Sequence, residues 1–288
     1  MVEIREFLKL EITRDCNLSC AHCYKGDKEK KYMSLETINR VFKNVSYINC
    51  LMIAGGESFL AIEQLEDIYN QIIKNNVDVE VMLIKTNCTI LNDKVVEILA
   101  KLSKVVGHLY VTTMADSFRR MEIINKGIKK QADEVATFLA ENDYLRVVKG
   151  DRPIQKIYNT GRAAILTEED IRKANENKSG SAEYCLTDDS EFYNSRGRYN
   201  SPSAIENFIY RTVYVTVDGN LCNITPYYHT YSQIDDMVEC NISEYDDLLD
   251  AVNGLNCKII KQMLEKEAQE RISGKLKLEY NKIKALKR

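Results

Sequence analysis

Short apolar segments alternate along the first half of this chain with segments of helical periodicity. Several runs rich in apolar and β-branched residues have the length and composition of buried strands: 6–12, 50–56, 79–87 and 108–113. Other segments place apolar side chains at helical spacing: 33–45, 61–76, 93–103 and 128–142. Ser34 stands where a helix N-cap belongs. Residues 144–150 and 154–163 predict a fifth and a sixth strand.

This alternation of strands and helices predicts a parallel sheet covered by helices. The fold class is therefore α/β, and a full or partial β/α barrel with a small C-terminal α+β domain fits the pattern best. A polar insertion at 177–206 interrupts the pattern, and the alternating run after it turns at Asp218-Gly219, which predicts a hairpin. We expect a barrel over 1–164 and a C-terminal domain with a basic helical tail over 165–288.

Composition narrows the classes of function. The 288 residues are 44% hydrophobic and 29% charged, with a net charge of -3, so the whole chain has no electrostatic attraction to nucleic acid or anionic membrane. We expect neither as a partner. The sequence has no basic start followed by an apolar run and no uninterrupted apolar stretch of membrane-spanning length, so we expect a cytoplasmic protein. Nine cysteines in such a chain favour metal binding or catalysis over a disulfide framework.

Cys16, Cys20 and Cys23 follow the first predicted strand with the spacing Cys-x3-Cys-x2-Cys. A structural zinc ion needs four protein ligands, so His22 or a distant cysteine would have to join them. A four-iron cluster held by three cysteines instead leaves one iron open to a cofactor or substrate. The triplet alone leaves zinc, electron transfer and catalysis open.

Other unusual residues follow the next three predicted strands, as "GGES", "TNC" and "TTMAD". Because active sites of β/α barrels lie at the carboxyl ends of the strands, we expect all of these segments to meet at one mouth of the barrel. The sequence therefore predicts a single site built around the cysteine triplet.

Two of these motifs carry a resemblance to a known family. "CNLSCAHC" resembles the Cys-x3-Cys-x2-aromatic-Cys signature of the radical S-adenosylmethionine (SAM) superfamily, with His22 at the aromatic position, and "AGGESF" resembles its Gly-Gly-Glu-Pro motif. "MSLETINRVF", "IKTNCTIL", "TGRA" and "VTVDGNL" look like the peptide-modifying branch, whose members carry a C-terminal SPASM or twitch domain.

The resemblance implies a partial (β/α)6 TIM-type barrel, and it implies which residues hold the cofactors. Cys16, Cys20 and Cys23 would bind three irons of one 4Fe-4S cluster, and SAM would chelate the fourth. The residues that the resemblance places around SAM are His22, Gly55, Gly56, Glu57, Asn87 and Thr112. The glycines would let the backbone approach the methionyl group, and Glu57 would accept hydrogen bonds from its ammonium. Asn87 and Thr112 would contact methionyl or ribose, and main chain near His22 would meet the adenine.

The resemblance also implies the reaction. A low-potential donor similar to flavodoxin or ferredoxin would reduce the cluster, SAM would be cleaved, and the 5'-deoxyadenosyl radical would abstract hydrogen from a peptide or protein substrate. No catalytic residue is assigned. A nucleoside or small metabolite is the alternative substrate. An iron-sulfur electron carrier or a zinc-binding module is the non-enzymatic alternative, but neither explains the glycine motif.

The sequence departs from the family pattern at Ser58, Cys88 and Met114, where proline, glycine and aspartate are usual. Cys88 could donate a hydrogen atom or simply be a buried thiol. The cysteines beyond the predicted barrel could hold an auxiliary cluster: Cys185, Cys222, Cys240 and Cys257. They are scattered singly, without the close pairs that fix ligand geometry, so we expect one cluster only.

Overall fold

The structure of the protein is a computed structural model. It describes residues 1–113, 117–143, 145–149, 161–170, 172, 208–209, 213–222, 231–235 and 238–253. The polar insertion, the basic tail, Cys185, Cys257 and Met114 lie outside these residues.

Strands and helices alternate through the first half of the chain, as the sequence predicts. The elements of this half are β1 (Val2–Thr13), α1 (Leu35–Phe42), β2 (Val45–Gly55), η1 (Ser58–Leu60), α2 (Ile62–Lys74), β3 (Asp78–Thr86), α3 (Asp93–Leu102), β4 (Val106–Thr113), α4 (Ser117–Asn125), α5 (Lys129–Glu141), β5 (Arg146–Lys149) and η2 (Gly161–Ile165). The later elements are β6 (Phe208–Ile209), β7 (Val213–Val215), β8 (Asn220–Cys222), α8 (Tyr231–Asp235), β9 (Val238–Asn241), η5 (Ile242–Glu244) and α9 (Leu248–Asn253).

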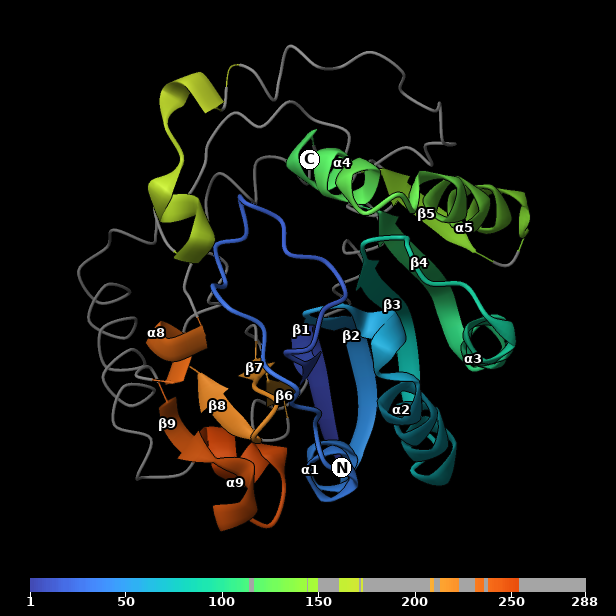
Figure 1. The fold of residues 1–288 in the computed structure, drawn as a ribbon. Helices are drawn as coiled ribbons and strands as arrows, with labels where there is room; N and C mark the ends of the chain where they lie inside the picture. Colours follow the sequence, from blue (N-terminus) through green and yellow to red (C-terminus); the bar gives the residue numbers. More distant parts are fainter. Residues whose placement is uncertain are drawn as a thin grey trace, which may run out of the picture.

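The strands form one open sheet in the order β5-β4-β3-β2-β1-β7-β8-β9, and β6 also pairs with β1. Strands β1 to β5 are parallel to their neighbours, and α1, α2 and α3 run along one side of them (Figure 1). This confirms the predicted α/β fold with an open, partial barrel. Of the predicted sixth strand at 154–163, residues 161–163 lie in η2, and the rest lies outside the described residues.

The main hydrophobic core lies between the sheet and its helices. On β1, Leu8, Leu10 and Ile12 are fully buried against this core, and Ile38 and Phe42 of α1 pack into it. Every second residue of a strand faces the same side, so these alternate side chains make one apolar layer. The core continues beneath the C-terminal elements, where Leu221, Ile242 and Leu248 belong to it. The sheet thus buries one continuous apolar face.

Local signals in the sequence set the ends of α1. The Ser34 hydroxyl accepts a hydrogen bond from the amide of Thr37, which confirms the predicted N-cap. The helix ends at Phe42 rather than at residue 45, because Asn44 takes a left-handed conformation with φ of 62° that asparagine tolerates well. Strand β2 therefore begins at Val45, earlier than the predicted start at residue 50.

The C-terminal elements extend the same sheet across β1. Residues 8–10 of β1 pair in parallel with residues 213–215 of β7, and β7 pairs in antiparallel with β8. The turn between β7 and β8 contains Asp218 and Gly219, whose φ is 79°, so the predicted hairpin is confirmed. The division into domains at 164/165 stays a prediction. None of the helices in the described ranges is long and apolar enough to cross a bilayer.

Candidate active site at the carboxyl ends of the strands

Residues 14–31, which we call the cysteine loop, leave the carboxyl end of β1 and return to its side. The two ends of the loop are tied together: the amide of Arg14 donates to the carbonyl of Lys31 at 3.0 Å, and the amide of Glu29 donates to the carbonyl of Arg14 at 3.2 Å. The loop carries Cys16, Cys20 and Cys23. A closed loop of this kind keeps all three thiols at the end of the first strand.

The donor set of the loop fits an iron-sulfur cluster by its chemistry, since thiolates are the usual ligands of such clusters. The amide of Leu18 donates to Cys16 Sγ at 3.4 Å, and Asn87 Nδ2 lies 3.9 Å from the same sulfur. Hydrogen bonds to sulfur tune such clusters. Across the described ranges, no three His, Cys, Asp or Glu side chains are already gathered as a metal site. Burial raises the pKa of the Cys16 thiol, so binding iron would have to displace its proton.

Gly55 and Gly56 bring the end of β2 against the start of the cysteine loop. A Cβ on Gly55 would lie 2.0 Å from the carbonyl oxygen of Thr13, and one on Gly56 would lie 2.0 Å from that of Asp15. The amide of Gly56 donates to Thr13 O at 2.8 Å, and that of Glu57 donates to Asp15 O at 2.8 Å. The observed close approach is therefore to the end of β1 for Gly55 and to the cysteine loop for Gly56. Their approach to a methionyl group stays a prediction.

The Glu57 carboxylate is fully buried and joins the ends of β2 and β3. Its Oε1 accepts from Thr86 Oγ1 at 2.6 Å and from the amide of Phe59 at 3.0 Å, while Oε2 accepts from the amide of Asn87 at 2.6 Å. Burial raises the pKa of Glu57, and these three donors oppose the rise. This framework role was not predicted from the sequence. The contact with a SAM ammonium stays a prediction, and it would have to share oxygens that already accept hydrogen bonds.

Asn87 connects the end of β3 to the cysteine loop. Its Nδ2 donates to Asn17 Oδ1 at 2.8 Å, and its Oδ1 accepts from the amide of Thr89 at 3.1 Å. The Thr89 hydroxyl in turn accepts from Asn17 Nδ2 at 2.7 Å. Next to Asn87, Cys88 is buried with φ of 58°, where the family has glycine, and burial raises the pKa of its thiol. The segments after β1, β2 and β3 therefore meet, as predicted.

The remaining predicted site residues lie further along the same edge. His22 stacks on Phe118 of α4, with ring centroids 5.3 Å apart and an angle of 18° between the rings. Thr112 lies near the carboxyl end of β4, in register with Lys85 of β3 and next to Thr113. The segment after β4 that begins at Met114 lies outside the described residues. The roles predicted for His22 and Thr112 stay predictions.

Residues 10–149, from the last part of β1 to the end of β5, match the model of the radical SAM superfamily. This part of the chain, just under half of it, is therefore similar to the radical SAM superfamily.

Two curated relatives share part of this radical SAM region. An uncharacterized protein of Methanocaldococcus jannaschii, MJ0907, is 30% identical over 111 residues, which are 37% of this chain and 39% of that protein. GTP 3',8-cyclase of Clostridium perfringens is 31% identical over 123 residues, 40% of this chain and 38% of the cyclase. The match with each relative spans less than half of its length.

Solved structures resemble the chain more loosely. One, described as native anSMEcpe with bound AdoMet and Cp18Cys peptide, aligns over 85% of this chain and 79% of its own, with 15% identity and a TM-score of 0.45. SuiB of Streptococcus suis aligns over 85% of this chain and 64% of its own, with 15% identity and a TM-score of 0.43. TM-scores this low carry no information about function.

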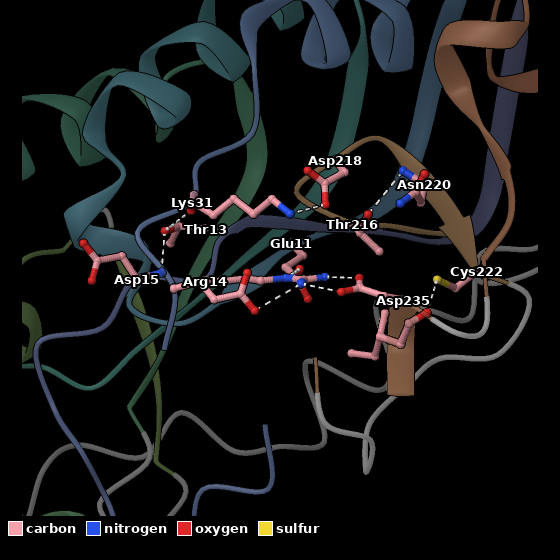
Figure 2. A network of polar contacts seen from close by, with 12 residues as sticks. Glu11, Thr13, Arg14, Asp15, Lys31, Thr216, Asp218, Asn220, Cys222 and Asp235 are labelled. Atoms are coloured by element: carbon pink, nitrogen blue, oxygen red, sulfur yellow. Dashed lines mark hydrogen bonds and ion pairs between the residues drawn. The ribbon is translucent and has the colours of Figure 1, made fainter. Parts of the chain in front are cut away.

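An ion-pair network centred on the buried Arg14 lies just before the first cysteine of the cysteine loop (Figure 2). Arg14 is fully buried, and its Nε donates to Glu11 Oε1 at 2.7 Å. Its two terminal nitrogens donate to the two carboxylate oxygens of Asp235 at 2.9 and 2.6 Å. The Tyr214 hydroxyl donates to Glu11 Oε2 at 2.6 Å, and the Tyr231 ring lies 4.7 Å from the Arg14 guanidinium. No local pattern in the sequence could have paired Arg14 with Asp235.

Two candidate ligands of an auxiliary cluster lie on opposite faces of the sheet. Cys222 packs with Tyr231 and Ile234 beside α8, and its thiol lies 3.9 Å from the carbonyl of Ile234. Cys240 pairs in register with Leu221 and belongs to the helix-covered core, 3.8 Å from the carbonyl of Ala251. Cys240 lies on the same face as its partner Leu221, and Leu221 and Cys222, as neighbours in β8, face opposite sides of the sheet. The two thiols therefore cannot bind one cluster in this arrangement. The expectation of a single cluster is retained.

Proposed function

We propose that this chain is a radical SAM enzyme with a single 4Fe-4S cluster on Cys16, Cys20 and Cys23, and that it abstracts hydrogen from a peptide or protein substrate. One observation carries the proposal: the cysteine loop, the glycine pair and the end of β3 are joined by hydrogen bonds at one edge of a parallel sheet. The amide of Glu57 donates to Asp15 O in the loop, and the Glu57 carboxylate accepts from the amide of Asn87.

The three thiols would hold three irons and leave the fourth to SAM. When bound and reduced, the cluster supplies the electron that cleaves SAM to methionine and a 5'-deoxyadenosyl radical. The residues around it would position SAM: Gly55, Gly56 and Glu57 at the methionyl end, Asn87 and Thr112 at methionyl or ribose, and main chain near His22 at the adenine. Electrons would come from a protein similar to flavodoxin or ferredoxin.

The peptide substrate is supported by the motifs that the chain shares with the peptide-modifying branch. "TGRA" at 160–163 lies at the end of the predicted barrel, and "VTVDGNL" at 215–221 lies in the predicted C-terminal domain. The second of these forms the hairpin between β7 and β8, which lies next to β1 in the sheet. A substrate-binding domain at this edge would flank the cysteine loop.

A nucleotide substrate is the second candidate, because Lys9 of β1 and Lys25 of the cysteine loop lie over the same Tyr214 ring, on the face of the sheet opposite α1, α2 and α3. Lys9 is buried and Lys25 is half-buried, and desolvation lowers the pKa of Lys9 to about 6 and that of Lys25 to about 8. Lys85 of β3 is a half-buried lysine near Lys9, and an anionic substrate would favour the charged form of all three. The relation to GTP 3',8-cyclase makes this candidate specific.

The proposed chemistry is tested by incubating the anaerobically purified chain with SAM and dithionite and measuring 5'-deoxyadenosine. We expect product from the wild type and none from Cys20→Ala. Cys50→Ala is the matched control, since Cys50 packs in a small apolar cluster with Met52 and Val81 and should not affect cleavage. Product from the Cys20→Ala chain, or none from the wild type, would contradict the proposal. Stimulation by a peptide or by GTP then separates the two substrate classes.

A further inference from the structure

Three backbone carbonyls of the cysteine loop are held by one residue that follows β5. Arg162 Nε donates to the carbonyl of Cys20 at 3.0 Å, and Arg162 Nη1 donates to that of Gly26 at 2.6 Å. The backbone amide of Arg162 donates to the carbonyl of Cys23 at 3.0 Å. Two of these three carbonyls belong to residues proposed to bind iron.

Gly161 makes this contact sterically possible. Its φ is 57°, and a Cβ at this position would lie 2.5 Å from the backbone nitrogen of Gly26 and 2.6 Å from the carbonyl oxygen of Tyr24. Both obstacles are backbone atoms, which cannot move aside as the end of a side chain could. The pair Gly161-Arg162 in "TGRA" therefore acts as a unit: the glycine permits the approach, and the arginine holds the loop.

The Arg162 guanidinium donates its hydrogen bonds to carbonyl oxygens rather than to a carboxylate. Its ion pair with Asp27 is long, at 3.8 Å, and the Asp27 side chain is fully exposed, so it neutralises little of the charge. A planar guanidinium offers several donors in fixed directions, which a lysine cannot reproduce. Hydrogen bonds from a charged donor are stronger than those between neutral groups, so the loop carbonyls are firmly placed.

We propose that Arg162 is a positioning residue of the cluster, which fixes the backbone at Cys20, Cys23 and Gly26 so that the three thiols can face one cluster. This inference rests on the proposed function, because it concerns the same cysteines. It assigns a role to a motif that lies well beyond the iron-binding sequence. Residues that orient the ligands of a metal commonly affect its affinity as strongly as some ligands do. The positive charge would also favour the reduced, more negative cluster.

The test uses five variants of the full chain, purified and reconstituted without oxygen. Arg162→Met removes the donors and the charge while keeping a long side chain, and Arg162→Lys keeps the charge alone. Gly161→Ala adds a Cβ that would collide with the backbone of the cysteine loop and keep Arg162 away from it. Arg172→Met is the matched control, because Arg172 is exposed and its guanidinium pairs with Glu169 at 2.7 Å.

We expect Arg162→Met to lose iron to a chelator on the order of tenfold faster than the wild type, from the loss of charge-assisted hydrogen bonds. Its reduced cluster should show an altered electron paramagnetic resonance spectrum and a lower reduction potential. Arg162→Lys should restore part of the potential but little of the iron retention. Arg172→Met should match the wild type in both, and urea unfolding of the iron-free chains should differ little among the arginine variants.

Gly161→Ala checks the same contact without removing charge, and it should also lose iron faster. Gly127→Ala is its control: Gly127 has a φ of 69°, but a Cβ there would meet nothing within 4 Å. Equal iron loss and equal spectra in the wild type and Arg162→Met would overturn the role of Arg162 and leave the proposed function intact. A wild type that holds no cluster would overturn both.

Discussion

The two faces of β1 are both buried, but they differ in chemistry. On the face towards the helices, Leu8, Leu10 and Ile12 are 0% exposed and pack in the main core. On the opposite face, Lys9 is 4% exposed and Glu11 is 0% exposed, within one residue of those leucines. Burying charged groups costs free energy unless they are paired, so chains seldom keep them without a use. The apolar face of β1 packs in the main hydrophobic core, and the charged face supports the cysteine loop.

The partners of the charged face support this distinction. Glu11 accepts hydrogen bonds from Arg14 and Tyr214, and Arg14 continues to Asp235 (Figure 2). The network starts in β1, includes Arg14 at the start of the cysteine loop, and reaches α8 through Asp235. A second contact joins the same elements, because the amide of Tyr231 in α8 donates to the carbonyl of Lys25 in the loop at 3.0 Å. Buried charge on this face therefore supports the loop rather than the core.

The largest change in stability is expected on the apolar face. Leu10→Ala removes a fully buried side chain and leaves a cavity, so we expect the free energy of unfolding to fall by about 2–5 kcal/mol in urea titrations. Leu35→Ala is the matched control, since Leu35 is 50% exposed on α1, and it should change stability by less than about 0.5 kcal/mol. A similar loss in both variants would break the contrast between the faces.

A smaller change is expected on the charged face. Glu11→Gln keeps the shape but weakens the hydrogen bond from Arg14, which still has Asp235, so we expect a loss of about 1.5–3 kcal/mol. Glu36→Gln removes an exposed ion pair to Arg40 and should cost less than about 0.5 kcal/mol. If Glu11→Gln proved as mild as Glu36→Gln, the buried network would have no structural role.

Much of this fold could be predicted from the sequence, because local patterns determine it. Runs of apolar and β-branched residues predicted strands β1 to β4, which are confirmed. The N-cap at Ser34 and the turn at Asp218-Gly219 are confirmed as well. The expectation that motifs after successive strands meet is also confirmed for β1, β2 and β3, since the carboxyl ends of parallel strands share one edge. These features depend on spacing within a few residues.

The remaining features depend on partners that are far apart in the sequence. Arg14 is paired with a residue 221 positions away, and Arg162 reaches Cys20 across 142 positions. Nothing near either arginine indicates its partner. The glycine pair was predicted as a feature of the site, but its contact with the cysteine loop became visible only when β2 was placed beside β1. Long-range pairing of this kind is a property of the folded chain.

The most direct test of the central claim is the iron and labile sulfide content of the anaerobically purified chain. We expect about four irons and about four sulfides per chain in the wild type, and none after replacing Cys16, Cys20 and Cys23 together by alanine. Stoichiometric zinc without labile sulfide in the wild type would contradict the assignment of these cysteines to an iron-sulfur cluster.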